Sequence, residues 1–339
     1  MLKPVALAIS LLSVASIGNA AVNQIGSIAS PGTVSQLAYS SETGTLVLRD
    51  SGNAIRVLDL GTQKVTSLQM ANSMFTDIDL SPSGKVLYAA DYGYERIGYG
   101  IPINQHYVHR LDLQTGQWST QTTNGIAGNL ETIDDQRFIL QGRDQWVRTS
   151  VNQWGAGTAV SPIHVLPWRQ YAGNMQHDAT HGRLIHASTR LSEPEVYGIK
   201  LTDNSSEIEE HKVLYGANSG DTVVLASDDS AFYYGSWQFD AQDLRQVKRV
   251  FPEQIIAANG TYALSSTQYY DALTGRLLGS LGGTFNTFAF SRSAADFWGF
   301  DTSTNKLVHF ASSVPEPSAW ASMLIGLVAL GAMARRKQA

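Results

Sequence analysis

The chain has 339 residues, of which 43% are apolar and 16% are charged. This composition excludes a disordered chain, because the apolar side chains suffice for a large core. Its 24 Lys and Arg and 29 Asp and Glu residues give a formal net charge of −5, which argues against a nucleic-acid partner, because such a partner calls for a basic face. Cysteine is absent, which excludes disulfides and thiol chemistry.

Residues 1–20 have the proportions of a secretory signal peptide. Lys3 precedes an apolar run over residues 5–14, and a stretch of small residues then ends at Ala20. Cleavage after Ala20 gives an exported body that we place at residues 21–312. That length is usual for a single large all-β domain.

A turn that leads into an alternating strand recurs along this body. It is clearest at residues 81–89, and it returns at residues 42–48 and 180–187. Fainter copies are found near Gln136, Ser230, Gly260 and Ala294. From Gly44 to Ala294 the seven copies span 250 residues in six intervals, which gives a period of about 42 residues.

A second piece, a Leu-Asp turn, recurs between the copies of the first. It is found at residues 58–65 and 111–118, and in shortened form at residues 271–277. The units consist of short β runs separated by turn residues, and no segment between the two chain ends has a sustained helical period. Four strands in each of seven units predict an all-β fold, a seven-bladed β-propeller.

The repeated pieces resemble bacterial YVTN-type and WD40-like propeller repeats. This resemblance implies the fold alone, because the Gly-His and Trp-Asp signatures of true WD40 repeats are missing. The seventh unit, residues 286–310, is one strand short, and we expect residues 24–29 to supply its outermost strand and close the ring. The apolar runs at residues 223–225 and 285–290 are typical of inner strands.

Three long loops are expected on one rim of the propeller. They are an insertion at residues 92–107, a connector between the third and fourth units at residues 167–171, and a loop at residues 190–195. Aromatic and Arg side chains give large contact area and forked hydrogen bonds. The candidate ligand-binding residues are therefore Tyr92, Tyr94, Arg96, Tyr99, Tyr107, Trp168, Arg169 and Tyr171.

Two interpretations of this rim stay open. Aromatic side chains flanked by Arg, Asn and Glu suit a sugar ligand. Alternatively, the same rings pack the insertion onto its own blade, because a long loop needs a small core of its own.

Catalytic and cofactor motifs are not found in the sequence. It contains no G-x-S-x-G, no G-x-x-x-x-G-K, no G-x-G-x-x-G and no H-E-x-x-H, and we expect neither a cofactor nor a catalytic residue. The weak metal candidate is His177, His181 and His186, where a hairpin would bring the first and third almost opposite each other. The competing interpretation is core and turn histidines, so we expect no metal site.

A partial calcium-loop pattern occurs in the second unit. The beginning of such a loop is imitated by Asp77, Asp79, Ser81, Ser83 and Gly84, but Tyr88 occupies the twelfth position where a Glu belongs. The repeated turn explains the same residues. A catalytic acid and base cannot be chosen among the acids, since partners would come from different blades.

The C-terminal residues 313–339 have three parts in order. Val314, Pro315, Glu316 and Pro317 form an extended tetrapeptide that a protease can reach. Residues 318–334 carry no charge and are long enough for one thin-bilayer transmembrane helix, and the cluster Arg335, Arg336 and Lys337 is expected on the cytoplasmic side.

This tail resembles the PEP-CTERM sorting signal of Gram-negative bacteria. The resemblance implies recognition by an exosortase, transient anchoring in the inner membrane and cleavage near the Pro-Glu-Pro. It also implies release to the cell surface or an extracellular polysaccharide matrix. The alternative is a plain C-terminal anchor.

These observations favour an exported, non-catalytic binding or matrix module at the cell surface or in extracellular polysaccharide. Its expected partners are the exosortase, a polysaccharide or an envelope protein, and not nucleic acid. Two alternatives stay open: an extracellular carbohydrate-active lyase or hydrolase on the propeller face, and a protein-interaction platform in matrix assembly.

Overall fold

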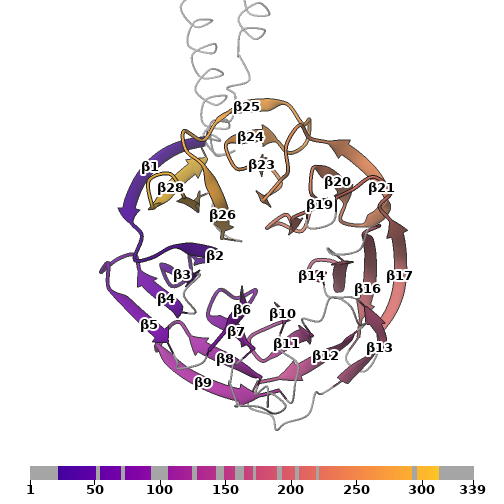
Figure 1. The fold of residues 1–339 in the computed structure, drawn as a ribbon, viewed down its shortest axis with the longest axis horizontal. Coiled ribbons are helices and arrows are strands. Elements are labelled where there is room, and N and C mark those ends of the chain that lie inside the picture. The colour runs from indigo at the N-terminus through magenta and orange to yellow at the C-terminus, as the bar shows by residue number, and fades with distance from the viewer. Residues whose placement is uncertain are drawn as a thin grey trace, which may run out of the picture. The chain divides into compact units, whose positions relative to one another are not determined.

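Twenty-eight strands arranged as seven four-stranded antiparallel sheets make up the described part of the chain. The structure is a computed structural model, and it describes residues 22–50, 54–69, 73–92, 106–123, 128–142, 149–156, 164–170, 173–188, 193–202, 206–218, 221–291 and 296–312. Figure 1 shows the sheets arranged in a ring, with β2, β6, β10 and β14 toward the centre and β5, β9, β17 and β21 at the rim. The predicted seven-bladed β-propeller is confirmed.

The first four blades each use four consecutive strands, numbered here from the channel outward. Blade 1 contains β2 (Val34–Ser40), β3 (Thr45–Asp50), β4 (Ala54–Asp59) and β5 (Val65–Gln69). Blade 2 contains β6 (Phe75–Leu80), β7 (Val86–Asp91), β8 (Tyr107–Asp112) and β9 (Gln117–Thr122). Blade 3 contains β10 (Asn129–Thr132), β11 (Arg137–Gln141), β12 (Thr149–Gly155) and β13 (His164–Gln170). Blade 4 contains β14 (Gly173–Asp178), β15 (Arg183–Ser188), β16 (Glu195–Leu201) and β17 (Ser206–Val213).

The last three blades complete the ring. Blade 5 contains β18 (Val223–Leu225), β19 (Ala231–Tyr234), β20 (Trp237–Asp240) and β21 (Asp243–Val250). Blade 6 contains β22 (Ala257–Ala258), β23 (Tyr262–Leu264), β24 (Gln268–Asp271) and β25 (Leu277–Ser280). Blade 7 contains β26 (Phe285–Phe290), β27 (Asp296–Asp301), β28 (Lys306–Ser312) and, as its outermost strand, β1 (Val22–Ala29).

Closure of the ring by the N-terminal strand is confirmed, because β1 pairs with β28. The Ser30 amide donates to the Asn305 carbonyl over 3.2 Å, which places the end of β1 beside the beginning of β28. The two strands therefore run antiparallel. Blade 7 joins both ends of the propeller and leaves β28 with a neighbour on each edge.

The recurring first turn of the sequence joins the first and second strands of a blade. It turns at Gly44, Gly84 and Gly182, whose φ angles of 63°, 71° and 65° favour glycine. The Leu-Asp turn joins the third and fourth strands, and the Asp59 carboxylate accepts from the Thr62 amide over 2.7 Å. The side chain of Asp112 does the same for Thr115 at 2.9 Å.

These two kinds of turn lie on the same face of the ring, which we call the first-turn face. The residue after the third strand donates its amide to the first turn of its own blade, as in Leu60 to Gly44 and Ala272 to Thr261, both over 2.9 Å. The loops between second and third strands and the connections between blades lie on the opposite face, the connector face. There the amide of Phe251 donates to the carbonyl of Ser236 over 2.8 Å.

The hydrophobic core lies between adjacent blades. Leu37 and Leu46 of blade 1 pack with Trp298 and Phe300 of blade 7, and similar clusters join the next blades around the ring. All residues of β7 and β15, both second strands, are buried. Because each core is shared by two blades, a blade is stable only with its neighbours in place.

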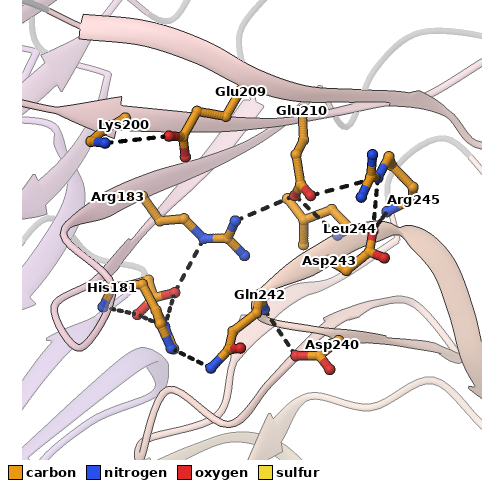
Figure 2. Close-up of polar contacts among 11 residues, drawn as sticks. His181, Arg183, Lys200, Glu209, Glu210, Asp240, Gln242, Asp243, Leu244 and Arg245 are labelled. Carbon is orange, nitrogen blue, oxygen red and sulfur yellow. Dashed lines mark hydrogen bonds and ion pairs between the residues drawn. The ribbon is translucent and has the colours of Figure 1, made fainter.

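Blades 4 and 5 are also joined by a polar network, drawn in Figure 2. The Arg183 guanidinium lies 3.2 Å from Asp178 Oδ2 and 3.3 Å from Glu210 Oε2. Glu210 accepts in addition from the Leu244 amide of blade 5 over 3.1 Å. Arg183 is only 6% exposed, so this ion cluster is buried between the blades.

One element differs from the prediction. The segment expected as a connector at residues 167–171 belongs, up to Gln170, to β13, the outermost strand of blade 3. The pairing of Ser150 with Arg169 holds it in the sheet, and Pro167 falls where the register shifts. Proline is tolerated at an irregular position of an edge strand. Such a strand pairs with only one neighbour, so the missing N–H of proline need not interrupt hydrogen bonding to a second strand.

The expected inner strands at residues 223–225 and 285–290 are confirmed as β18 and β26. Contacts divide the chain into residues 24–310 and a second unit of residues 1–23 and 311–339, of which the structure describes only the ends of β1 and β28. Within the described ranges, no helix is long and apolar enough to cross a membrane. The expected signal peptide and the expected span at residues 318–334 lie outside those ranges.

Candidate functional site

The central channel contains a cavity of about 400 Å³. First strands from all seven blades line it, and it extends to the first-turn face, where the lining includes Ser41, Glu42, Ser83, Ser227 and Ser291. This volume falls in the range of small-ligand sites.

Side chains from one blade cover the free edge of the next first strand. Gln36 of blade 1 donates from Nε2 to the Ile78 carbonyl over 2.8 Å and accepts at Oε1 from the Ile78 amide over 3.1 Å. Glu131 of blade 3 accepts from the His177 amide over 2.6 Å, and Gln176 of blade 4 accepts from the Leu225 amide over 3.1 Å. Backbone groups that the sheet cannot pair are thereby satisfied.

Two aspartates of blade 2 continue the same pattern. Asp77 accepts from the Leu130 amide over 2.9 Å and from Gln36 Nε2 over 2.8 Å. Asp79 accepts from the amide and the hydroxyl of Thr132, over 2.7 and 2.6 Å. Burial raises the pKa of Asp77, and burial also raises the pKa of Asp79 to about 6, with the nearby Asp77 charge adding to the increase.

The walls of the cavity differ in chemistry. Carboxylates from blades 1, 2, 3 and 5 line it, namely Glu42, Asp79, Glu131 and Asp229, and among the residues that the structure describes no lysine or arginine does. Apolar residues line it as well, and those of blades 5, 6 and 7 are Val224, Leu225, Ile256, Ala257 and Phe288. The cavity therefore suits an uncharged or cationic molecule with hydroxyl groups on one side and an apolar face on the other.

The structure describes the base of the predicted rim but not its tip. Tyr92 and Tyr107 lie at the two ends of the insertion, and the Tyr92 ring contacts His106 edge-on with centroids 4.4 Å apart. His106 is buried, which lowers the pKa of its imidazole. The rings of Tyr92 and His106 thus pack against each other where the insertion joins blade 2.

The other predicted rim residues cannot be placed as a site. Tyr94, Arg96, Tyr99 and Tyr171 lie outside the described residues, as does most of the loop at residues 190–195. Trp168 and Arg169 belong to β13, of which the structure describes the backbone only. The rim stays a prediction, on the connector face and thus opposite the first-turn end of the cavity.

A Ser, Asp and His group is buried in blade 2. Ser73 donates to Asp91 over 2.7 Å, and His109 Nε2 lies 3.2 Å from the same carboxylate oxygen. The serine hydroxyl is thus bonded to the carboxylate and not to the imidazole, and His109 is 1% exposed. This arrangement holds β7 and β8 together and does not activate a nucleophile.

The three histidines of the weak metal candidate are separated. His177 lies opposite Leu184 and His186 lies opposite Met175, so the expected pairing of the two histidines is wrong. His177 lines the cavity, His186 bonds Gln141 over 3.0 Å in the core, and His181 bonds Asp178 in the turn. Among the described side chains, no group of three His, Cys, Asp or Glu residues could hold a metal ion.

The calcium-like residues of blade 2 serve other contacts. Asp77 and Asp79 cover β10 as described, and Ser83 donates to Asp135 of the next first turn over 2.6 Å. Ser83 thus belongs to the repeated turn, whereas Asp77 and Asp79 are strand residues that contact the next blade. Sequence reasoning missed the covering role of Gln36, Glu131 and Gln176, although their recurrence at the first strands was a usable signal.

Comparison with known proteins adds two findings. Residues 313–337 match the PEP-CTERM protein-sorting motif. The crystal structure of the β-propeller domain of Cps50 (Swd1) from Myceliophteria thermophila is similar, with a TM-score of 0.62 and 16% identity over 86% of this chain and 99% of that chain. No curated protein matches.

At this identity the structural likeness shows the fold alone. The chain therefore combines a seven-bladed β-propeller with a C-terminal PEP-CTERM motif. The motif implies export, processing by an exosortase, and a C-terminus held in the membrane before processing.

Proposed function

We propose that the propeller, once cut from its tail, is a non-catalytic binding module at the cell surface or in extracellular polysaccharide, with the channel cavity as its ligand site. The observation that carries this proposal is the cavity itself, of about 400 Å³ and lined by both carboxylate and apolar residues. A sugar unit has matching chemistry, since its hydroxyls edge a ring with an apolar face.

The carboxylates of the cavity support a binding role over a catalytic one. Asp79 and Glu131 each accept hydrogen bonds from the first strand of the next blade. A catalytic carboxylate must exchange its proton with a substrate, and these two are committed to holding neighbouring blades. Substituting either carboxylate would mainly weaken the contact between neighbouring blades.

Binding of purified extracellular polysaccharide from the producing strain tests the proposal. Thr287→Tyr and Ser227→Tyr place bulk at two half-buried positions of the lining, and Ser303→Tyr, on the connector face, is the matched control. We expect saturable binding by the wild type and the control, and at least about tenfold weaker binding by the two lining variants, a loss of about 1.4 kcal/mol.

The predicted rim gives the second arm of this experiment. A Trp168→Ala, Tyr94→Ala and Tyr99→Ala variant that loses binding, while the lining variants keep it, would move the site to the connector face. No binding by the wild-type propeller would contradict polysaccharide as the ligand and favour an envelope protein as partner, the third role that the sequence left open.

The enzymatic alternative is favoured by one observation, the pKa of about 6 at Asp79. A carboxyl group that titrates near neutrality can act as a general acid, and Glu131 lines the same cavity. Incubating the polysaccharide with the protein separates the two roles. Shortened or unsaturated products that disappear in a Glu131→Gln variant with an unchanged melting temperature would establish a hydrolase or lyase and refute the binding module.

A further inference from the structure

Both ends of the propeller leave it on the first-turn face, at blade 7. β26 and β27 pair Phe285 with Asp301 and Phe290 with Phe297, so the turn after Asp301 lies on the connector face. β28 begins after that turn and ends at Ser312 on the opposite, first-turn face. β1 runs antiparallel to it and begins there at Val22.

The chain between β28 and the membrane tail is short. Only the five residues 313–317 separate Ser312 from the charge-free run at residues 318–334. At full extension these five residues span at most about 18 Å. An inserted tail therefore holds Ser312, and the first-turn face around it, close to the lipid surface.

The two turns that flank blade 7 on this face have exposed apolar and basic side chains together. In blade 6, Leu273 is 79% exposed and Leu277 is 52% exposed, with the exposed Arg276 beside them. In blade 1, Val65 is 40% exposed and follows the exposed Lys64. The equivalent turn of blade 2, residues 112–117, has neither a cation nor an exposed large apolar side chain.

We infer that these two turns, Lys64 with Val65 and Leu273 with Arg276 and Leu277, are a lipid-docking surface that contacts the bilayer until the tail is cut. The inference rests on the proposed membrane anchoring of that tail. Cationic side chains are attracted to anionic headgroups, and apolar side chains beside them enter the headgroup boundary. Because each contribution is small, the contact is weak without the tether.

This surface lies on the same face as one end of the channel cavity. Ser41 and Glu42 of blade 1 and Ser291 of blade 7 line the cavity there, in the two blades nearest the tether. Contact with lipid on this side hinders entry to the cavity from that end. Cleavage of the tail then frees the protein and exposes this end of its proposed ligand site in a single step.

The test uses the full chain, inserted by its tail in vesicles of phosphatidylethanolamine and phosphatidylglycerol. The protein has no cysteine, so Thr274→Cys on the first-turn face and Ser303→Cys on the connector face of blade 7 each give one labelling site. Each is labelled with an environment-sensitive fluorophore, and a nitroxide-labelled lipid is added as quencher. We expect quenching at position 274 to exceed that at position 303 at least about threefold.

Equal quenching at the two positions, or stronger quenching at position 303, would overturn the inference while leaving the anchoring intact. A chain that does not float with the vesicles at all would overturn the anchoring, and the inference with it. Lys64→Gln, Leu273→Ser and Arg276→Gln together should lower the quenching at position 274 to about half. Unchanged quenching in that variant would refute these turns as the contact.

Discussion

The Oδ2 atom of Asp79 lies 2.7 Å from the amide nitrogen of Thr132 and 2.6 Å from its hydroxyl oxygen. One carboxylate oxygen of blade 2 thus holds the first strand of blade 3 at the wall of the channel. Burial raises the pKa of this carboxyl to about 6. The same group therefore joins two blades and makes their stability depend on pH.

We expect Asp79→Asn to remove part of that dependence. Between pH 4 and 6 the folded protein keeps a proton on Asp79 that the unfolded chain has released, so the free energy of unfolding falls as pH rises through this window. The wild type should lose on the order of 2 to 3 kcal/mol from this group by pH 7. Urea unfolding of both proteins at pH 4, 5, 6 and 7 measures the difference.

Parallel pH profiles for the wild type and Asp79→Asn would show that this carboxyl titrates normally. The comparison must be made as a difference between the two proteins, since other groups titrate in the same range. Asparagine keeps one acceptor oxygen, so a constant offset between the profiles, from the lost hydrogen bond, is compatible with the prediction.

His186 should act with the opposite sign. Burial lowers its pKa to about 3, so as pH falls below about 6.5 the unfolded chain takes up a proton that the folded protein excludes. Stability is then lost progressively toward pH 3, by about 2 to 3 kcal/mol at pH 4.5. His186→Gln, which can still bond Gln141, should reduce the fall in melting temperature between pH 6.5 and pH 4.5. An equally large fall in the variant and the wild type would contradict the assignment.

Arg183→Ala should be strongly destabilising. It leaves Asp178 and Glu210 without the guanidinium that contacts both, and removing one partner of a buried ion cluster costs about 3 to 5 kcal/mol. Lys200→Ala is the matched control, because Lys200 and Glu209 are 3.7 Å apart with side chains 57% and 41% exposed. That change should cost less than about 1 kcal/mol in urea unfolding. Similar losses for both variants would contradict a buried role for Arg183.

Deletion of residues 22–29 should lower the melting temperature of the propeller by about 10 °C or more. The deletion removes β1 and exposes the edge of β28, and it also removes Ile28 from the core of blades 1 and 7. Circular dichroism melts check this, with deletion of residues 313–339 as the control that should leave the melt unchanged. A propeller that melts normally without β1 would show that ring closure does not depend on it.

Much of the fold could be predicted from the sequence because its turns repeat. Gly84 and Asp112 mark positions where the backbone needs a left-handed residue or a side-chain acceptor, and these needs recur in several blades. The role of residues 24–29 could also be predicted by counting strands, because the seventh unit has only three strands and lacks an outermost one. Requirements of this kind depend on residues that are close together in the sequence, so a sequence pattern can show them.

The site was harder to predict because it is made by residues from different blades. Gln36 meets Ile78 and Glu131 meets His177 across gaps of 42 and 46 residues, and nothing local indicates which partner each takes. The register of the fourth hairpin was also wrong, since its turn places His186 opposite Met175. The connector expected at residues 167–171 is an irregular edge strand up to Gln170.

The place of β28 between β27 and β1 has a mechanical consequence. While the tail is inserted, a force that pulls the propeller away from the membrane acts on the end of β28. Pulling that strand out requires breaking hydrogen bonds to both neighbours, whereas an outermost strand would peel away from one. The tail is thus attached to a strand that is hydrogen-bonded on both edges. Cleavage beyond Ser312 removes the attachment without breaking any strand pairing.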